Sequence, residues 1–452
     1  MLTRLCFIIG LHFLLSVQVL SQATFFSGGF DTALKTSASQ GKLLMVILDS
    51  KTCYKCNEAT TIGLLSEDAR KINDSCLIFR PAVNSRFADS LRRIHLTNPD
   101  EAFAVLFFDE TGTVVYRVAM TSNQSATYLN FMRTAFSRSL GNKQVAVLEK
   151  EWQSQPSSLA LTKRLIELRL NNRMESDSLV QHYVRLLPAD SLATQETLKL
   201  MLISAPIIAS AVDSLMYKYY PQLQKAWLIF KKNEQDEINF RKINKSMDRA
   251  VADKNLKLGV LVANYSKNIQ GSKRIGEYVF YREFLRYCYA AKDTLNYFRQ
   301  ADLFAKDFFM SLAIDSLDRE DSLMVNKWKN EPDTSANTAT KTMSGSALKP
   351  NAIASRREKV GMELNRLAWQ VYELYRNPTI LLEAQKWSKR SVEMIRLPEF
   401  LDTYGRLLYQ TGDVGLAIEQ MKMAVQICDD LEIPNVEFTA ILRKMEKGLP
   451  LR

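Results

Sequence analysis

Histidine is scarce in this chain of 452 residues, which has only His12, His95 and His182. A structural zinc ion takes four protein ligands, mainly cysteine and histidine, so this composition disfavours a metal site. The chain also lacks the G-x-S-x-G nucleophile motif, the glycine-rich phosphate loop and the H-E-x-x-H zinc motif. These absences argue against the enzyme classes that carry those motifs, and we expect neither a cofactor nor a bound metal ion.

Long apolar runs are confined to the first residues of the chain. Arg4 precedes the apolar stretch 5–20, and the small residues Ser21 and Ala23 follow it. This is the pattern of a secretory signal peptide, which we place at residues 1–23, with an uncleaved N-terminal anchor as the alternative. No later stretch is apolar enough to span a bilayer. The sequence therefore predicts an exported, periplasmic protein with no integral membrane span after signal cleavage.

Charge and length set broad limits on the protein. The chain has 60 Lys and Arg against 49 Asp and Glu, a net charge of +11, but the basic residues form no dense block. A solvated helical surface explains this spread better than nucleic-acid binding, which we do not expect of an exported chain. The length predicts two or three domains, and a hydrophobic fraction of 46% supports packed cores.

Cysteine is also sparse, and its spacing is informative. Outside the signal peptide the chain keeps an odd number of cysteines, too few for a disulfide scaffold of this length: Cys53, Cys56, Cys76, Cys288 and Cys428. The single close pair, Cys53 and Cys56, follows an apolar run and begins a helix-compatible segment. Unpaired N–H groups and the positive end of a helix dipole favour a thiolate there. Cys76, Cys288 and Cys428 are predicted to be buried thiols.

The first third of the mature chain reads as one α/β unit. Apolar runs predict strands, and helical spacing predicts helices between them. We expect helices at 30–40, 53–71, 86–95 and 125–140, and strands at 43–48, 76–83, 103–108 and 113–118, with a turn at 109–112. The run 43–48 is continuously apolar, as a central buried strand should be.

This order of elements resembles the thioredoxin-like family. The segments that carry the resemblance are 30–46, which enters the first central strand, Cys53-Tyr54-Lys55-Cys56 at the position of the redox motif, and 105–112, which matches the hairpin strand and turn. The resemblance covers roughly the first third of the chain. It implies a central mixed sheet flanked by helices. The sequence departs from the family pattern at Thr52, where tryptophan is usual, and near Phe103, where the family has a cis-proline.

The resemblance implies a thiol–disulfide exchange site. Cys53 is then the attacking thiol and Cys56 the resolving thiol, with Lys51 and Lys55 adding positive potential. The implied partner is a protein or peptide client with cysteines. A permanent structural Cys53–Cys56 disulfide and a metal site are the alternatives at the level of the site. A non-enzymatic periplasmic binding or scaffold protein with a redox-inactive thioredoxin-like domain is the alternative function.

The rest of the chain reads as helical. Residues 331–354 are small and polar and predict a flexible linker or inserted loop. Helical stripes fill 141–330, including predicted helices at 198–212, 222–230 and 278–289. An aromatic run on the last of these, at 278–287, has helical spacing and is predicted to be core.

The last hundred residues carry a repeat signal. Residues 367–372 align with 404–409, and Ala384 and Ser391 then align with Ala417 and Ala424. Small residues such as Ala417 and Gly405 allow two helices to approach closely. This pattern resembles the tetratricopeptide repeat, and the alternative is an irregular helical bundle.

We therefore expect five segments: a signal peptide at 1–23, a thioredoxin-like domain at 24–140, a helical domain at 141–330, a linker at 331–354 and tetratricopeptide-like repeats at 355–452. The fold class is an α/β thioredoxin-like domain followed by an all-α helical array. The array supplies a surface for a client or binding partner. The combination resembles exported thioredoxin-like proteins of Bacteroidota-type bacteria.

Overall fold

The structure is a computed structural model that describes residues 24–50, 54–65, 69–83, 85–95, 103–330, 355–431 and 435–451. The chain divides into two compact units, Met1–Ser204 and Ala205–Arg452, and each is described by itself. The predicted signal peptide at 1–23 and the predicted linker at 331–354 lie outside the described residues.

A four-stranded mixed sheet organises the first unit. Its strands are β1 (Leu43–Leu48), β2 (Cys76–Phe79), β3 (Ala104–Phe108) and β4 (Val114–Val118), in the spatial order β2-β1-β3-β4. β1 and β2 are parallel, whereas β3 is antiparallel to both β1 and β4. Phe25 adds an isolated parallel bridge to Ile78 at the outer edge of β2. The continuously apolar β1 is thus a central strand with neighbours on both sides.

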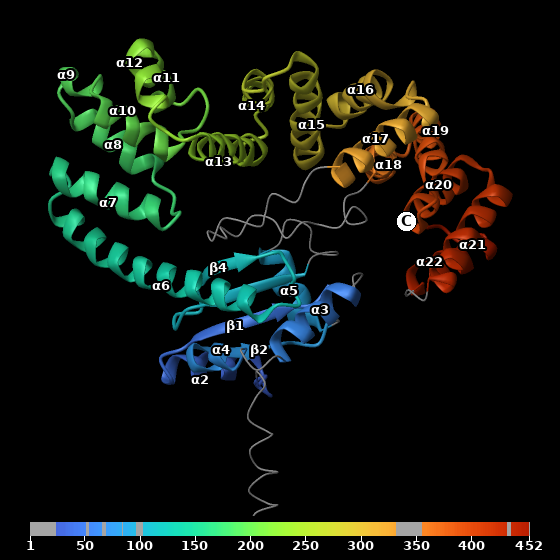
Figure 1. The fold of residues 1–452 in the computed structure, drawn as a ribbon, viewed down its shortest axis with the longest axis horizontal. Coiled ribbons are helices and arrows are strands. Elements are labelled where there is room, and N and C mark those ends of the chain that lie inside the picture. Colours follow the sequence, from blue (N-terminus) through green and yellow to red (C-terminus); the bar gives the residue numbers. More distant parts are fainter. Residues whose placement is uncertain are drawn as a thin grey trace, which may run out of the picture. The chain divides into compact units, whose positions relative to one another are not determined.

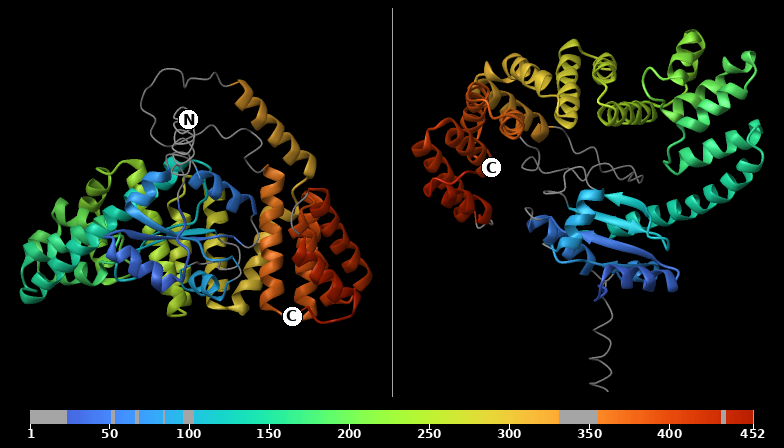
Figure 2. Two further views of the ribbon diagram at one scale, coloured as in Figure 1. Left: turned by 90° about the horizontal axis from the view of Figure 1, so that it is seen from below. Right: turned by 180° about the vertical axis from the view of Figure 1, so that it is seen from behind.

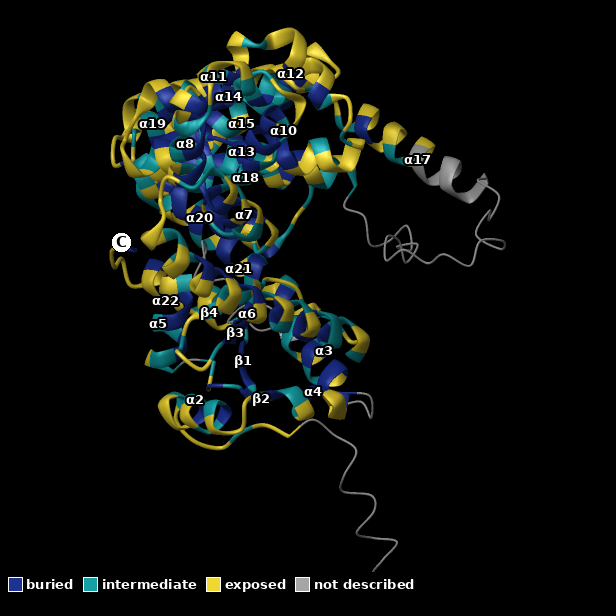
Figure 3. Cartoon of the chain, turned by 90° about the vertical axis from the view of Figure 1, so that its left-hand side faces the viewer, coloured by how far each residue is buried: buried dark blue, intermediate teal, exposed yellow. Residues whose placement is uncertain are grey.

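Helices cover both faces of this sheet (Figure 1). Because side chains alternate along a strand, Met45 and Ile47 of β1 join one core and Leu44 and Val46 the other. The first core is shared with α3 (Tyr54–Leu65), α4 (Arg70–Ser75) and α6 (Ser125–Ser154), and the second with α2 (Phe30–Ser39) and α5 (Arg86–His95). The two inner strands, β1 and β3, are accordingly buried along their whole length and dark blue in Figure 3. The result is a three-layer α/β/α arrangement.

Several predicted elements match the structure and three differ. β1 and α5 have the predicted bounds, but the helix predicted at 53–71 is divided into α3 and α4. β2 ends at Phe79 and not at Val83, since Pro81 has no N–H for a sheet ladder. α6 continues beyond the predicted 140 to Ser154, so the domain boundary placed at 140 lies within one helix.

The remainder of the first unit is a run of helices. They are α7 (Leu159–Asn171), α8 (Asp177–Leu186), α9 (Ala189–Leu192) and α10 (Gln195–Ser204). α6 and α7 pack closely enough that a Cβ on Gly141 would overlap the side chain of Asn172. After β4 the described residues contain helices and no strand, which confirms the predicted order of a small sheet followed by helices.

The described residues of the second unit form helices and no strand. Its helices are α11 (Ala211–Lys218), α12 (Tyr220–Trp227), α13 (Lys232–Ala252), α14 (Leu256–Asn268), α15 (Lys273–Ala291), α16 (Thr294–Ala305), the π-helical turn η3 (Lys306–Met310), α17 (Ile314–Asn330), α18 (Arg356–Leu374), α19 (Pro378–Met394), α20 (Pro398–Thr411), α21 (Val414–Asp430) and α22 (Val436–Glu446). Consecutive helices pack together from α13 to α16 and again from α17 to α22 (Figure 2).

The single helix predicted at 198–212 is wrong. α10 ends at Ser204 and α11 begins at Ala211, because Ala205 and Ala209 have positive φ angles of 49° and 61°. Side chains hold this irregular turn. Asp213 Oδ2 accepts a hydrogen bond from the Ala209 N–H at 2.8 Å, and Ser246 Oγ accepts one from the Ile208 N–H at 2.9 Å. Periodicity in the sequence does not show these tertiary contacts.

Small residues lie at close contacts between the C-terminal helices. A Cβ on Gly405 of α20 would lie 3.2 Å from the carbonyl oxygen of Ala417 in α21, as predicted from their small size. Ala384, Ala417 and Ala424 are completely buried. The predicted aromatic run of α15 packs into or against the core of this unit. No helix among the described residues is both long and apolar enough to cross a membrane.

Candidate functional site

Cys56 lies in the first turn of α3, directly after the loop that follows the central strand β1. It is disulfide-bonded. Cys76, Cys288 and Cys428 are free, so none of them is its partner. Cys53, the predicted attacking thiol, lies outside the described residues. Lys51 also lies outside them, and the side chain of Lys55 is not described.

The three free thiols are poor candidates for chemistry. Burial raises the pKa of Cys76 and of Cys288 to about 12, and it also raises the pKa of Cys428. A thiol must ionise before it can attack a disulfide, so these groups stay protonated and unreactive at neutral pH. Their burial agrees with the prediction. Among the described cysteines, Cys56 is therefore the candidate for thiol–disulfide exchange.

Asn57, next to Cys56, ties the start of α3 to the end of β1. Its Oδ1 accepts from the Ser50 N–H at 2.9 Å, and its Nδ2 donates to the Ser50 carbonyl oxygen at 2.9 Å. The side chain therefore satisfies both backbone groups of a residue that is only 2% exposed. The sequence does not mark Asn57 as a support of this turn, because its partner is a backbone group that becomes adjacent only in the fold.

An arginine from the neighbouring strand supports the same turn. Arg80 directly follows β2, and its guanidinium makes two hydrogen bonds to Asp49, which directly follows β1: Nε to Oδ2 at 2.8 Å and Nη2 to Oδ1 at 2.7 Å. It also donates to Thr61 Oγ1 at 2.8 Å and to the Asn57 carbonyl oxygen at 3.2 Å, both on α3. One side chain thus joins the ends of two strands to the helix that carries Cys56.

A second arginine, Arg92, binds the backbone of Asp49. Arg92 of α5 is only 1% exposed and donates from Nη2 to the Asp49 carbonyl oxygen at 2.5 Å and from Nη1 to the Val83 carbonyl oxygen at 2.9 Å. It also pairs with Asp89 at 2.8 Å. Arg92 shares the buried face of α5 with Ala88 and Leu91. The sequence signal for this contact is a basic residue at an apolar position of the helix.

A buried hydrogen-bond network holds α3 against α6 and the loop before it. Thr60 Oγ1 donates to the Cys56 carbonyl oxygen at 3.0 Å and accepts from the Tyr128 hydroxyl at 3.0 Å. That hydroxyl also accepts from the Ser122 N–H at 3.0 Å. A Cβ on Gly63 would lie 2.7 Å from both the Ser122 carbonyl oxygen and Cε2 of Tyr128, so only glycine allows this approach.

Phe103, directly before β3, lies near the position where the thioredoxin-like pattern predicts a cis-proline. Phe103 is 6% exposed and belongs to the core shared with α3 and α6. No cis peptide bond occurs among the described residues. The described part of the chain also contains no group of three or more His, Cys, Asp and Glu side chains that could hold a metal ion.

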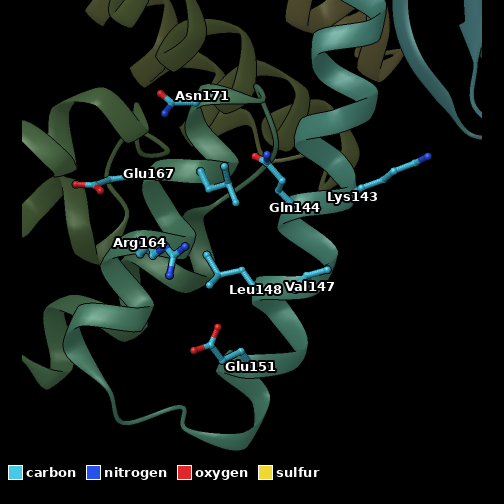
Figure 4. A pocket seen from close by; sticks show the side chains of 9 residues that line it. Lys143, Gln144, Val147, Leu148, Glu151, Arg164, Glu167 and Asn171 are labelled. Carbon is cyan, nitrogen blue, oxygen red and sulfur yellow. The ribbon is translucent and has the colours of Figure 1, made fainter.

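A groove of about 640 Å³ lies between α6 and α7 of the first unit (Figure 4). Val147 and Leu148 contribute apolar surface from α6, and Arg164 and Glu167 contribute charges of both signs from α7. The lining contains no cysteine, serine or histidine. The groove has no thiol, hydroxyl or imidazole side chain in its lining, and the first turn of α3 at Cys56 is the better candidate for a reactive site.

Comparison with models of known protein families, with curated proteins and with solved structures gives no match. A function for this chain must therefore be argued from the geometry of the Cys56 turn.

Proposed function

We propose that this protein is an exported thiol–disulfide exchange protein whose first unit has a thioredoxin-like fold. The observation that carries the proposal is a disulfide-bonded Cys56 in the first turn of the helix that follows the central strand of a β2-β1-β3-β4 mixed sheet. A helix N-terminus stabilises a thiolate through its unpaired N–H groups and its dipole. Cys53 is the proposed disulfide partner of Cys56, since two intervening residues suit a redox pair at a helix start.

The proposed reaction moves two electrons between the pair and a client. In the reducing direction the Cys53 thiolate attacks one sulfur of a client disulfide, a mixed disulfide forms, and the first client thiolate leaves and takes up a proton. The Cys56 thiolate then attacks the Cys53 sulfur, which forms the Cys53–Cys56 disulfide and releases the second client thiol. The client is reduced by two electrons and the pair is oxidised by two. In the oxidising direction the same steps run in reverse.

The helical remainder of the chain is proposed to bind the client or a partner protein. Three features support a tetratricopeptide-like array in the second unit: the pairing of α18 with α19, the pairing of α20 with α21, and the close contact at Gly405. Stacked helix pairs of this kind present an extended surface for a peptide or protein. The proposed location is periplasmic or otherwise exported, and it rests on the signal-peptide pattern at residues 1–23.

A second candidate function is a non-enzymatic binding or scaffold protein with a permanent disulfide. The observation that favours it is Phe103, which lies directly before β3, at or next to the position where the thioredoxin-like family has a cis-proline. The close support of the turn by Asn57, Arg80 and Thr60 would serve a permanent disulfide equally well. The two candidates differ in whether a client disulfide ever reaches the pair.

Trapping of mixed disulfides distinguishes the two functions. We expect the Cys56→Ser variant of the full chain, expressed with export in a bacterial host, to accumulate mixed disulfides through Cys53. These would appear as slower bands after acid quenching and thiol blocking, would vanish on reduction, and would be identified by mass spectrometry. The Cys53→Ser/Cys56→Ser double variant and the Cys76→Ser variant are the matched controls. Bands no stronger than those of the double variant would reject exchange and favour the scaffold.

A further inference from the structure

The Asp49–Arg80 ion pair lies at the edge of the sheet where β1 and β2 end and α3 begins. Asp49 follows Leu48, the last residue of β1, and Arg80 follows Phe79, the last residue of β2. The side chains are 13% and 19% exposed, respectively. A two-point pair of this kind is geometrically specific, and partial burial protects it from screening by salt.

The guanidinium is also in direct contact with the helix that carries the disulfide. Arg80 Nη2 is shared between Asp49 Oδ1 and the carbonyl oxygen of Asn57, the residue after Cys56. Arg80 Nη1 donates to Thr61 one turn further along α3. The pair therefore places one positive and one negative charge beside the first turn of α3. The electrostatic potential at that turn depends on both.

Opposite charges affect a thiol pair in opposite ways. A nearby positive charge stabilises a thiolate, which stabilises the reduced form and makes the disulfide easier to reduce. A nearby carboxylate does the reverse. Arg80 and Asp49 largely cancel each other at this turn, because each is held against the other by two hydrogen bonds. Loss of either member would expose the charge of its partner.

We infer that Arg80 and Asp49 are positioning residues that set the reduction potential of the Cys56 disulfide through opposed charges. This inference rests on the proposed exchange function. It assigns the ion pair a role that differs from support of the fold alone. Both side chains take part in the same hydrogen bonds, but their charges shift the reduction potential of the disulfide in opposite directions.

The test compares Arg80→Gln and Asp49→Asn in the full chain, each equilibrated with glutathione redox buffers and assayed by thiol blocking and mass spectrometry. We expect Arg80→Gln to lower the equilibrium constant for reduction about tenfold, equivalent to about 30 mV, and Asp49→Asn to raise it by a similar factor. The double variant should return to within about threefold of the wild type, since both charges are gone. Arg80→Lys, which keeps the charge, should also stay within about threefold.

A matched control pair is available on two helices of the same unit. Arg169 of α7 donates through Nε to Glu149 of α6 at 2.8 Å, with side chains 23% and 29% exposed. Arg169→Gln and Glu149→Gln should leave the equilibrium constant unchanged. They remove a partly buried Arg–carboxylate pair of similar exposure that makes no hydrogen bond to α3.

The outcomes separate the inference from the function on which it rests. Shifts in the same direction for Arg80→Gln and Asp49→Asn, or no shift in either, would overturn the inference while exchange by the wild type stands. If Arg80→Gln does not fold, a tenfold change in Arg80→Lys overturns the inference, and an unchanged value in Arg80→Lys with a raised one in Asp49→Asn supports it. A wild-type disulfide that glutathione does not reduce at all would overturn both proposals together.

Discussion

Removal of the Tyr128 hydroxyl tests whether the buried hydrogen-bond network holds the disulfide-bearing helix in place. Tyr128 and Thr60 are completely buried, and the Tyr128 hydroxyl contacts Thr60 Oγ1, the Ser122 N–H and the Ser122 carbonyl oxygen, each at 3.0 Å. Burial raises the pKa of Tyr128, so the hydroxyl remains a neutral donor at any physiological pH. Tyr128→Phe keeps the ring and deletes only these contacts.

The expected cost follows from what the deletion leaves behind. A net hydrogen bond contributes about 0.5–1.5 kcal/mol, and a buried polar group without a partner costs about 1–3 kcal/mol. Ser122 is half-buried and can regain a hydrogen bond from water. Thr60 is completely buried, so its Oγ1 keeps the bond to the Cys56 carbonyl oxygen but finds no replacement for the Tyr128 donor. We therefore expect Tyr128→Phe to lower the local free energy of opening of α3 by about 1–3 kcal/mol.

Hydrogen exchange measured by mass spectrometry on peptides from α3 is the suitable assay, because it reports local opening in the full chain. The expected loss corresponds to exchange that is roughly 5-fold to 150-fold faster. Thr60→Val should show a similar effect, and the double variant should lose less than the sum of the two, with a coupling of about 0.5–1.5 kcal/mol. Tyr116→Phe is the control, since the described residues provide no hydrogen-bond partner for that hydroxyl, and it should change stability by less than about 0.5 kcal/mol. A Tyr128→Phe effect as small as the control, or strictly additive effects, would refute the reasoning.

Three further predictions concern other parts of the fold. In the native protein the three free thiols should resist alkylation at pH 8 and react only in denaturant, because all three are buried and burial raises the pKa of each. Rapid labelling of any of them in mass spectra would contradict this. Lys242→Met should destabilise the second unit by about 3–5 kcal/mol in urea titrations, because it leaves the buried Asp213 carboxylate without its cation. The carboxylate lies 2.5 Å from the Lys242 ammonium, and both side chains are 6% exposed. A loss below about 1 kcal/mol would be inconsistent with a buried pair. Gly405→Val should cost about 1–3 kcal/mol in the same titration, since its side chain meets the Ala417 carbonyl; an unchanged urea midpoint would show that the two helices can separate there at no cost.

The sequence predicts the elements of the first unit better than its contacts. The continuous apolar run of β1 and the helical spacing of α5 predict the observed bounds, because β1 is buried on both faces and α5 on one, and both patterns are local in the sequence. Cys56 was also found from the sequence, since a cysteine pair after an apolar run is a local motif. The division of the predicted 53–71 helix into α3 and α4 was missed.

The support of the Cys56 turn could not be predicted in the same way. Arg80 is 31 positions from Asp49 along the chain, and Tyr128 is 68 positions from Thr60. Such partners become neighbours only when the strand order is known, and a single sequence gives no register between distant segments. Asn57 illustrates the same limit at short range, since its partner is the backbone of Ser50 and no side-chain pattern marks it.

The reduction potential of the Cys56 disulfide in the full wild-type chain tests the central proposal most directly. It is measured by equilibration with glutathione or dithiothreitol buffers, followed by thiol blocking and mass spectrometry that assigns the pair to Cys53 and Cys56. An exchange protein should show a two-electron midpoint between about −120 and −270 mV, the range of known exchange proteins. A midpoint below about −300 mV, or a disulfide that connects Cys56 to a cysteine other than Cys53, would contradict the proposed function.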